Sequence, residues 1–222
     1  MATDAPMATA TDPALTLAQW FSPGFPVGGF HFSHGLEWAI DAGDVTDADT
    51  TKAWIAQVLE HGSGRNDAIL LAAAYHAADD ATLLSVDATA RALAATRERR
   101  IETEEMGAAF ARIAGALLDR PLPALTYPVA AGHAAQLAGL PQVLTAQFYL
   151  QAFAANLATV AMRLVPIGQT DGQTVIRDLT PLCRRIAEET AEGDMDALSS
   201  TVFLPDIAAM KHETQATRIF RT

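Results

Sequence analysis

The stretch of residues 141–165, PQVLTAQFYLQAFAANLATVAMRLV, decides the fold class of this chain. Its large apolar side chains recur every three or four positions, which is the spacing of a stripe along one face of an α-helix. They are Leu150, Phe153, Leu157, Val160 and Leu164. Pro141 stands where proline is tolerated, at the first turn of such a helix. The pattern predicts a long helix that packs one face into a protein core.

This stretch overlaps residues 121–162, which contain no Asp, Glu, Lys or Arg and resemble a membrane span in that respect. A spanning helix needs about 20 mostly apolar residues. The part most like a span, residues 143–165, instead carries Gln147, Gln151, Asn156 and Arg163, whose polar side chains are costly in lipid. We therefore expect a buried helix of a globular protein.

Helical spacing continues on both sides of this stretch, and no Asn-Gly or Asp-Gly turn is flanked by alternating apolar residues. We predict an all-α, single-domain, bundle-like fold of about eight to ten helices. Residues 1–13 are expected to form a flexible tail, residues 14–205 the helical core domain, and residues 206–222 a C-terminal helix and tail.

Local signals mark several helix ends. Thr46 or Asp47 can cap the helix that follows, and Asn66 and Asp171 are candidate caps further along the chain. Pro181 is expected to kink or restart the helix in which it lies, because proline lacks the backbone N–H.

Residues 97–105, RERRIETEE, are densely charged with both signs at the start of a helical pattern. Arg100 and Glu104 lie one helical turn apart, as expected for weak side-chain pairs along a helix. We interpret the run as a solvated helix face.

Bulk composition narrows the function classes. The 222 residues carry a formal net charge of −11, and 50% of them are hydrophobic. The negative charge disfavours binding to nucleic acids and to anionic membrane surfaces. Cys183 is the single cysteine, which excludes an intrachain disulfide, and the first residues lack the features of a signal peptide. We expect a cytoplasmic protein.

Residues 21–35, FSPGFPVGGFHFSHG, form an apolar loop with two prolines, four glycines and four phenylalanines. Proline fixes φ, and glycine permits positive φ and close backbone approach. Phe25, Phe30 and Phe32 can then be held in place with little entropy loss on docking. The pattern favours a preorganised turn that presents a surface to another protein, and Gly35 would let the following helix pack tightly.

His31, His34 and Glu37 follow one another at intervals of three. On a helix they would share one face and could bind a divalent metal ion. The alternative is that one histidine caps the turn while the other packs beside Trp38. We favour the structural roles and expect no metal site, while transient contact with nickel stays open.

No catalytic machinery is apparent. The serines lack the context of a nucleophile elbow, and no P-loop is present. Arg184 and Arg185 could lower the pKa of the Cys183 thiol, but a lone helical cysteine is more often a small buried apolar residue, as we expect here. We predict that the protein is not an enzyme.

The C-terminal segment forms a basic patch on an acidic protein. Lys211, Arg218 and Arg221 supply the charge, and Ile219 and Phe220 lie between the two arginines. Two interpretations are open: the tail docks on its own domain, or it orders against a partner through this apolar pair while the arginines bind carboxylates.

Three segments together resemble the urease accessory protein F family. Residues 22–40, SPGFPVGGFHFSHGLEWAI, resemble its N-terminal signature. Residues 163–173, RLVPIGQTDGQ, and the closing residues 206–222, DIAAMKHETQATRIFRT, follow in the family's order. Residues 72–125 carry no signature.

The resemblance implies a non-enzymatic, homodimeric, all-α chaperone of urease maturation. It would bridge the D-type (also called H-type) accessory protein and the G-type GTPase for GTP-dependent nickel insertion into apo-urease. The partner would bind the GTP, the complex would handle the nickel, and the chain would need no cofactor of its own.

By the same resemblance, two sets of residues would bind partners. The N-terminal set is Pro26, Val27, Gly28, Phe30, His34, Gly35 and Glu37. The C-terminal set is Lys211, His212, Glu213, Arg218, Ile219, Phe220 and Arg221.

Two alternative functions remain. A helical metal-dependent enzyme would use His31, His34 and Glu37. A GTPase-activating protein would supply Arg218 or Arg221 to a partner's active site.

Overall fold

The computed structural model describes residues 12–199 and 201–222, which form ten α-helices, two short 3₁₀ helices and no strand. The helices are α1 Pro13–Trp20, η1 Gly29–His31, α2 Leu36–Asp41, α3 Ala48–His61, α4 Ser63–His76, α5 Asp80–Ala92, α6 Arg97–Leu117, α7 Tyr127–Leu137, α8 Gln142–Leu164, α9 Gln169–Glu189, η2 Met195–Ala197 and α10 Phe203–His212. The predicted all-α fold is confirmed for this part of the chain.

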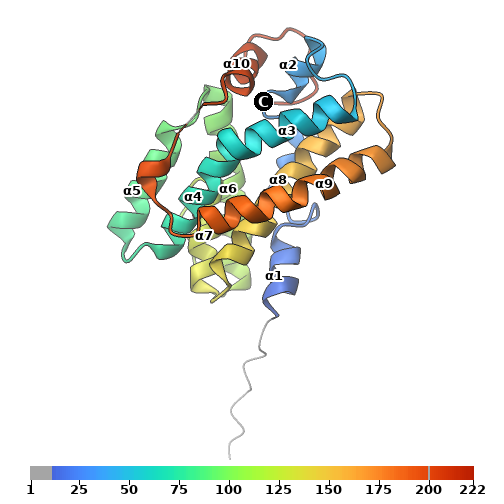
Figure 1. Ribbon diagram of the computed structural model, residues 1–222. Helices are drawn as coiled ribbons and strands as arrows, with labels where there is room; N and C mark the ends of the chain where they lie inside the picture. The colour runs from blue at the N-terminus through green and yellow to red at the C-terminus, as the bar shows by residue number, and fades with distance from the viewer. Residues whose placement is uncertain (1–11, 200) are drawn as a thin grey trace, which may run out of the picture.

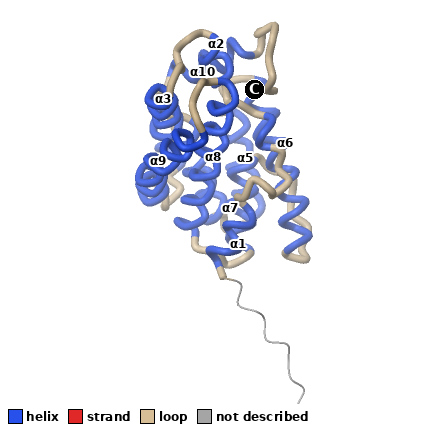
Figure 2. The backbone as a smooth tube through the Cα atoms, turned by 90° about the vertical axis from the view of Figure 1, so that its right-hand side faces the viewer, coloured by secondary structure: helices blue, strands red, loops and turns tan. Residues whose placement is uncertain are grey.

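Helix α8 lies at the centre of the bundle and packs against α1, α2, α3, α4, α7 and α9. Helices α3 and α9 lie side by side on one flank, and α4 packs against α7 (Figure 1). Helices α2 and α10 pack together at one end of the bundle, near the C-terminus, while α1 lies toward the other end (Figures 1 and 2).

Small residues let α4 and α7 approach closely. A Cβ atom added at Gly132 would lie 2.1 Å from the backbone oxygen of Leu71, so no side chain fits there. The neighbouring alanines of α7 are fully or almost fully buried: Ala130, Ala131, Ala134 and Ala135. Protein interiors of this kind are close-packed, so even one added carbon atom affects stability.

The predicted long helix is α8, and its core stripe is confirmed. Leu150, Leu157 and Val160 are at most 2% exposed. Two of the amides named above have partners: the Asn156 amide donates to the Phe32 carbonyl oxygen at 3.2 Å, and Gln151 accepts the Thr180 hydroxyl at 3.3 Å. No helix within residues 12–199 and 201–222 is long and apolar enough to cross a membrane.

Two of the expected helix caps differ, and the restart expected at Pro181 is absent. The N-cap residue of α9 is Gly168, and Asp171 lies inside the first turn, where it accepts the Gly168 N–H at 3.3 Å. Asp47 caps α3 as predicted, but Asn66 lies inside α4, and its amide group bonds the backbone of Ser199 at 2.7 and 3.2 Å. Helix α9 continues through Pro181 without a restart. Pro181 is exposed, so water can satisfy the carbonyl group that loses its partner.

The first helix begins inside the segment predicted to be a tail. Asp12 accepts a hydrogen bond from the Ala14 N–H at 2.9 Å, and Pro13 is the first residue of α1. Residues 1–11 of the predicted tail lie outside the described residues.

Candidate interaction site

Residues 213–222, called the C-terminal segment below, leave α10 and dock on the chain's own domain. The Arg221 N–H donates to the His31 carbonyl oxygen at 2.9 Å, and the Ser33 N–H donates to the Thr222 carbonyl oxygen at 2.9 Å. The Ser33 hydroxyl donates to the same oxygen. Of the two interpretations of the tail, the structure shows the first.

Glu37 is the central acceptor of this site. Its carboxylate is 6% exposed and accepts the backbone N–H groups of Ile219 at 2.6 Å and Phe220 at 2.9 Å. Hydrogen bonds to a charged acceptor are stronger than neutral ones, and a buried N–H without a partner is costly. Glu37 therefore sets the path of the C-terminal segment over the end of the bundle.

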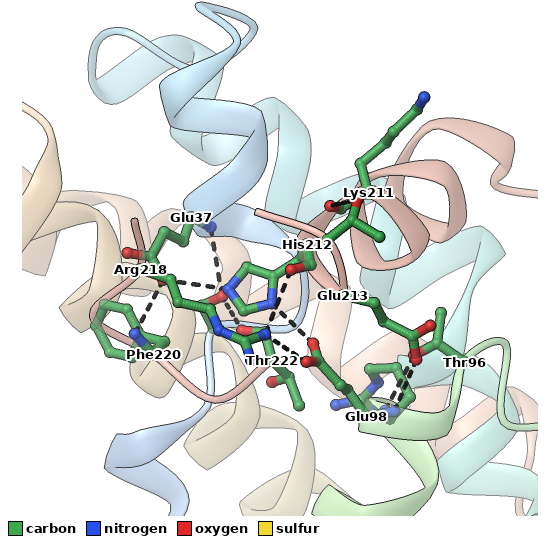
Figure 3. A network of polar contacts seen from close by, with 12 residues as sticks. Glu37, Thr96, Glu98, Lys211, His212, Glu213, Arg218, Phe220 and Thr222 are labelled. Atoms are coloured by element: carbon green, nitrogen blue, oxygen red, sulfur yellow. Dashed lines mark hydrogen bonds and ion pairs between the residues drawn. The ribbon is translucent and has the colours of Figure 1, made fainter. Parts of the chain in front are cut away.

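His212 lies between two carboxylates, as Figure 3 shows. The ring is fully buried, with Nδ1 2.8 Å from an oxygen of Glu98 and Nε2 3.2 Å from an oxygen of Glu37. A neutral imidazole has a single N–H. Which of the two carboxylates accepts its hydrogen bond therefore depends on the tautomer of the ring.

Three carboxylates on α6 receive the C-terminal segment, because residues spaced by four and three positions share one helix face. The pairs are Glu98 with Arg218, Glu102 with Thr222, and Glu105 with Arg221. The prediction of a solvated face over residues 97–105 is wrong for Glu102, which is buried, and for Glu98, which is mostly buried, while Glu105 is exposed as predicted.

The segment also caps α6. The Glu213 carboxylate accepts the backbone N–H of Glu98 at 3.1 Å, within the first helical turn. Free N–H groups and the positive end of the helix dipole favour a negative charge there.

Glu102 links the segment to the interior. It accepts the Thr222 hydroxyl at 2.8 Å and pairs with Arg99. Burial opposes its ionisation, but the charge of Arg99 and the contact with His34 outweigh burial and lower the pKa of Glu102 to about 2. Burial, with help from Arg99, lowers the pKa of His34 to about 4, so its ring is neutral near pH 7.

The two apolar residues of the segment, Ile219 and Phe220, differ in exposure. Phe220 is 3% exposed, and the Arg163 guanidinium lies 4.7 Å from its ring centre. Ile219 is 65% exposed. The sequence offered no sign that these neighbours would separate, because only the path fixed by Glu37 turns one inward.

The phenylalanines of the N-terminal loop also differ in exposure. Phe25 and Phe32 are buried in the domain, and only Phe30, at 61% exposed, is presented to solvent. Gly35 has a φ of +77°, and a Cβ atom there would lie 2.6 Å from the Ala209 backbone nitrogen. The predicted tight packing at Gly35 is therefore confirmed, with α10 as the neighbour.

The remaining predicted binding residues surround this site. Pro26 and Lys211 are exposed, and Val27 is half-buried. Gly28 adopts a φ of +77°, a left-handed conformation that favours glycine.

The possible metal ligands are not brought together. His31 is exposed in η1, while the buried His34 ring turns toward the Ser63 hydroxyl, 2.6 Å from Nε2. Glu37 binds the C-terminal segment. The chain is not helical at His34, whose φ is +59°, so the three do not share a helix face. The described residues contain no group of three His, Cys, Asp or Glu that could hold a metal ion.

Cys183 is the buried apolar residue that we expected. It is 2% exposed, and burial raises the pKa of its thiol to about 12. Arg184 pairs with Glu188, and Arg185 with Glu60 and Glu189, rather than with the sulfur.

Several residues of the site were not predicted: Ser33, Glu98, Glu102, Glu105 and Arg163. The one signal available for the three glutamates is their shared helix face. That spacing is equally typical of an exposed face, so it could not single them out.

Known proteins of similar sequence belong to one family. The family model described as UreF matches residues 45–180, including the part of the chain without a recognisable motif. The urease accessory protein UreF of Ruegeria pomeroyi is 55% identical, covering 97% of this chain and 100% of the relative. Those of Roseobacter denitrificans and Cereibacter sphaeroides are 50% and 52% identical, covering 96% and 94% of this chain and 96% and 98% of the relatives.

Proposed function

The chain belongs to the urease accessory protein F family, and we propose that in urease maturation it acts as a non-catalytic scaffold for assembly. In this proposal it bridges the D-type (H-type) accessory protein and the G-type GTPase on apo-urease, so that nickel is inserted with GTP hydrolysis by the partner.

One observation carries this proposal: the two predicted sets of partner-binding residues, about 180 positions apart, lie on one end of the molecule. Phe30 and Ile219 expose apolar surface there, and Lys211, Arg218 and Arg221 are exposed as well. Exposed apolar side chains among arginines are typical of the centre of a protein interface.

Helix α10 extends this surface. Phe203, Leu204, Ile207 and Met210 are between 43% and 73% exposed, and their spacing places them along one side of the helix. Together with Ile219 they supply the apolar area that a stable partner contact needs.

Co-purification with the D-type protein and the GTPase tests the proposal. Ile219→Asp should lower recovery of the D-type partner, and removal of residues 211–222 should abolish it. The matched control is Leu84→Asp, which changes a leucine on α5 that is 57% exposed. Equal recovery with the intact chain, the truncated chain and both variants would defeat the proposed role of the segment.

The two alternatives gain no support from the structure. The metal-dependent enzyme loses its ligand set, as described above. An arginine finger would require Arg218 or Arg221 to leave Glu98 or Glu105. If alanine at either position leaves GTP hydrolysis by the complete assembly unchanged, that arginine is not a finger.

The proposal includes a cytoplasmic homodimer without a cofactor, nucleic acid or membrane as partner. Light scattering of the purified chain would measure its oligomeric state, and elemental analysis its metal content. Nickel is expected in the assembled complex and not in stoichiometric amount on this chain.

A further inference from the structure

A cavity of about 450 Å³ lies beneath the N-terminal loop. Residues 20–30 form one side of it, and residues of α6, α7 and α8 form the others. This volume is in the range of small-ligand sites. Most of its wall is aromatic or aliphatic, with Phe21, Phe25, Phe30, Met106 and Phe153 among the contributors.

Asp67 of α4 also lines this cavity. The Tyr149 hydroxyl donates to its Oδ2 atom at 2.7 Å. Among the described residues, no Lys, Arg or His side chain forms an ion pair with Asp67, since Arg99, the nearby cation, pairs with Glu102. A carboxylate in this position lacks the cation that buried charges need.

The other ionisable groups around the cavity carry no net charge that could offset the charge of Asp67. Glu102 and Arg99 offset each other, His34 is neutral near pH 7, and the raised pKa values of Tyr127 and Tyr149 keep both hydroxyl groups protonated. Burial raises the pKa of Asp67 to about 6, so it is mostly ionised at pH 7.

The His34 ring also has an unmet hydrogen-bonding group. His34 is 7% exposed and lines the cavity, and its buried Nδ1 atom has no hydrogen-bond partner in the described part of the chain, since the nearest Glu102 oxygen lies 3.8 Å away. A buried polar atom without a partner is uncommon and costly.

We propose that this cavity binds a ligand that carries one ammonium or guanidinium group on an apolar stem. The cation pairs with Asp67, and the stem lies along the aromatic wall, which also attracts a positive charge. An anion would face Asp67 and Glu102 in a confined space. A purely apolar ligand would bury Asp67 without a counter-charge, at a cost of free energy. The site is independent of the proposed scaffold function.

Calorimetric titration of the full chain with n-hexylamine tests this proposal, with 1-hexanol and hexanoate as ligands of matched size. Hexylamine should bind more tightly than either. Its affinity should rise as the pH increases from about 5 to about 7, because ionised Asp67 binds the cation and the neutral acid does not. Equal binding of hexanol, or no binding of hexylamine, would overturn the proposal.

Asp67→Asn should weaken hexylamine binding roughly tenfold or more, since it removes the charge and keeps the shape. Asp41→Asn, at an exposed position on α2, is the matched control and should not change binding. If Asp67→Asn does not fold, the pH dependence of hexylamine binding to the unmodified chain tests the proposal instead. An affinity that does not change with pH would contradict the role of Asp67.

The ammonium or guanidinium group could belong to a side chain of a partner protein or to a free organic cation. A competition experiment distinguishes these two sources. Hexylamine that binds and displaces a partner from the assembled complex assigns the site to a lysine or arginine side chain of that partner. Hexylamine that binds without displacing a partner assigns it to a free organic cation. Both results support the proposed chemistry, whether or not the scaffold function holds.

Discussion

The interior around α4 and α7 and the docked C-terminal segment are held together by different forces. In the interior, glycine and alanine bring backbones into contact, and Ala131, Gly132 and Ala134 leave no room for larger side chains. In the segment, the contacts are hydrogen bonds and ion pairs to four glutamates: Glu37, Glu98, Glu102 and Glu105.

This difference bears on how each region behaves. Apolar burial is non-directional and strengthens with area, so the interior separates only when the domain unfolds. A hydrogen bond contributes about 1 kcal/mol net, because water replaces it when it breaks. We therefore expect the segment to detach from its contacts more easily than the interior separates, while the bundle stays folded.

The strongest test of the comparison is Gly132→Val. The added atoms would overlap the Leu71 backbone oxygen, so we expect a loss of about 3 kcal/mol or more in the free energy of unfolding, measured with urea. Gly139→Ala is the control: its site is open, but its φ of +64° should cost about 1 kcal/mol. Equal losses would mean that the contact between α4 and α7 is not tight.

Glu37→Ala should release the segment alone. It leaves the N–H groups of Ile219 and Phe220 without their acceptor, at a cost of about 2 kcal/mol in docking. Hydrogen exchange should show faster exchange across residues 213–222 and unchanged protection in α4 and α7. The exposed Glu192→Ala is the control. Loss of protection throughout the bundle would show that the two regions are not separable.

Acidification should act on two groups whose pKa values differ between the folded and unfolded chain, His34 and Asp67. His34 has a pKa of about 4 when folded and 6.5 when unfolded, so its contribution to stability is lost as the pH falls through that interval. Asp67 has a pKa of about 6 when folded and 3.8 when unfolded, so its contribution grows over nearly the same interval. The two changes oppose each other in the unmodified chain.

Asp67→Asn removes one side of this balance. Between pH 6.5 and pH 4 the variant should lose on the order of 2 kcal/mol more stability than the unmodified chain, measured by urea unfolding at each pH. Parallel curves for the two proteins would contradict the raised pKa of Asp67 in the folded chain.

The smallest effect is expected at the rim of the segment. Arg221 and Glu105 are each about half exposed, with side-chain exposures of 52% and 49%, so their ion pair is screened by water. Arg221→Met should change the free energy of unfolding by less than about 0.5 kcal/mol. A double-mutant cycle with Glu105→Gln that gives a coupling well above that value would place this pair among the major contacts.

Sequence patterns predicted the features that depend on near neighbours. The stripe of α8, the Asp47 cap and the buried Cys183 follow from spacing or composition and were confirmed. The family resemblance, drawn from motifs at residues 22–40, 163–173 and 206–222, was confirmed by a family model that matches residues 45–180 and by relatives that align over nearly the whole length. The error at Asn66 arose because its contact with Ser199 outweighed a local preference, and the restart expected at Pro181 is absent because α9 continues through it.

The sequence by itself determined the fold class and the family, because helical periodicity and short motifs are properties of residues a few positions apart. Only the tertiary structure decided that Glu98 and Glu102 are covered by the C-terminal segment while Glu105 pairs with it at the surface, and that Phe220 is buried while Ile219 is exposed. The physical reason is that a charged helix face has the same spacing whether it meets solvent or protein. Its partner here lies more than 100 positions away, and the folded backbone alone brings the two together.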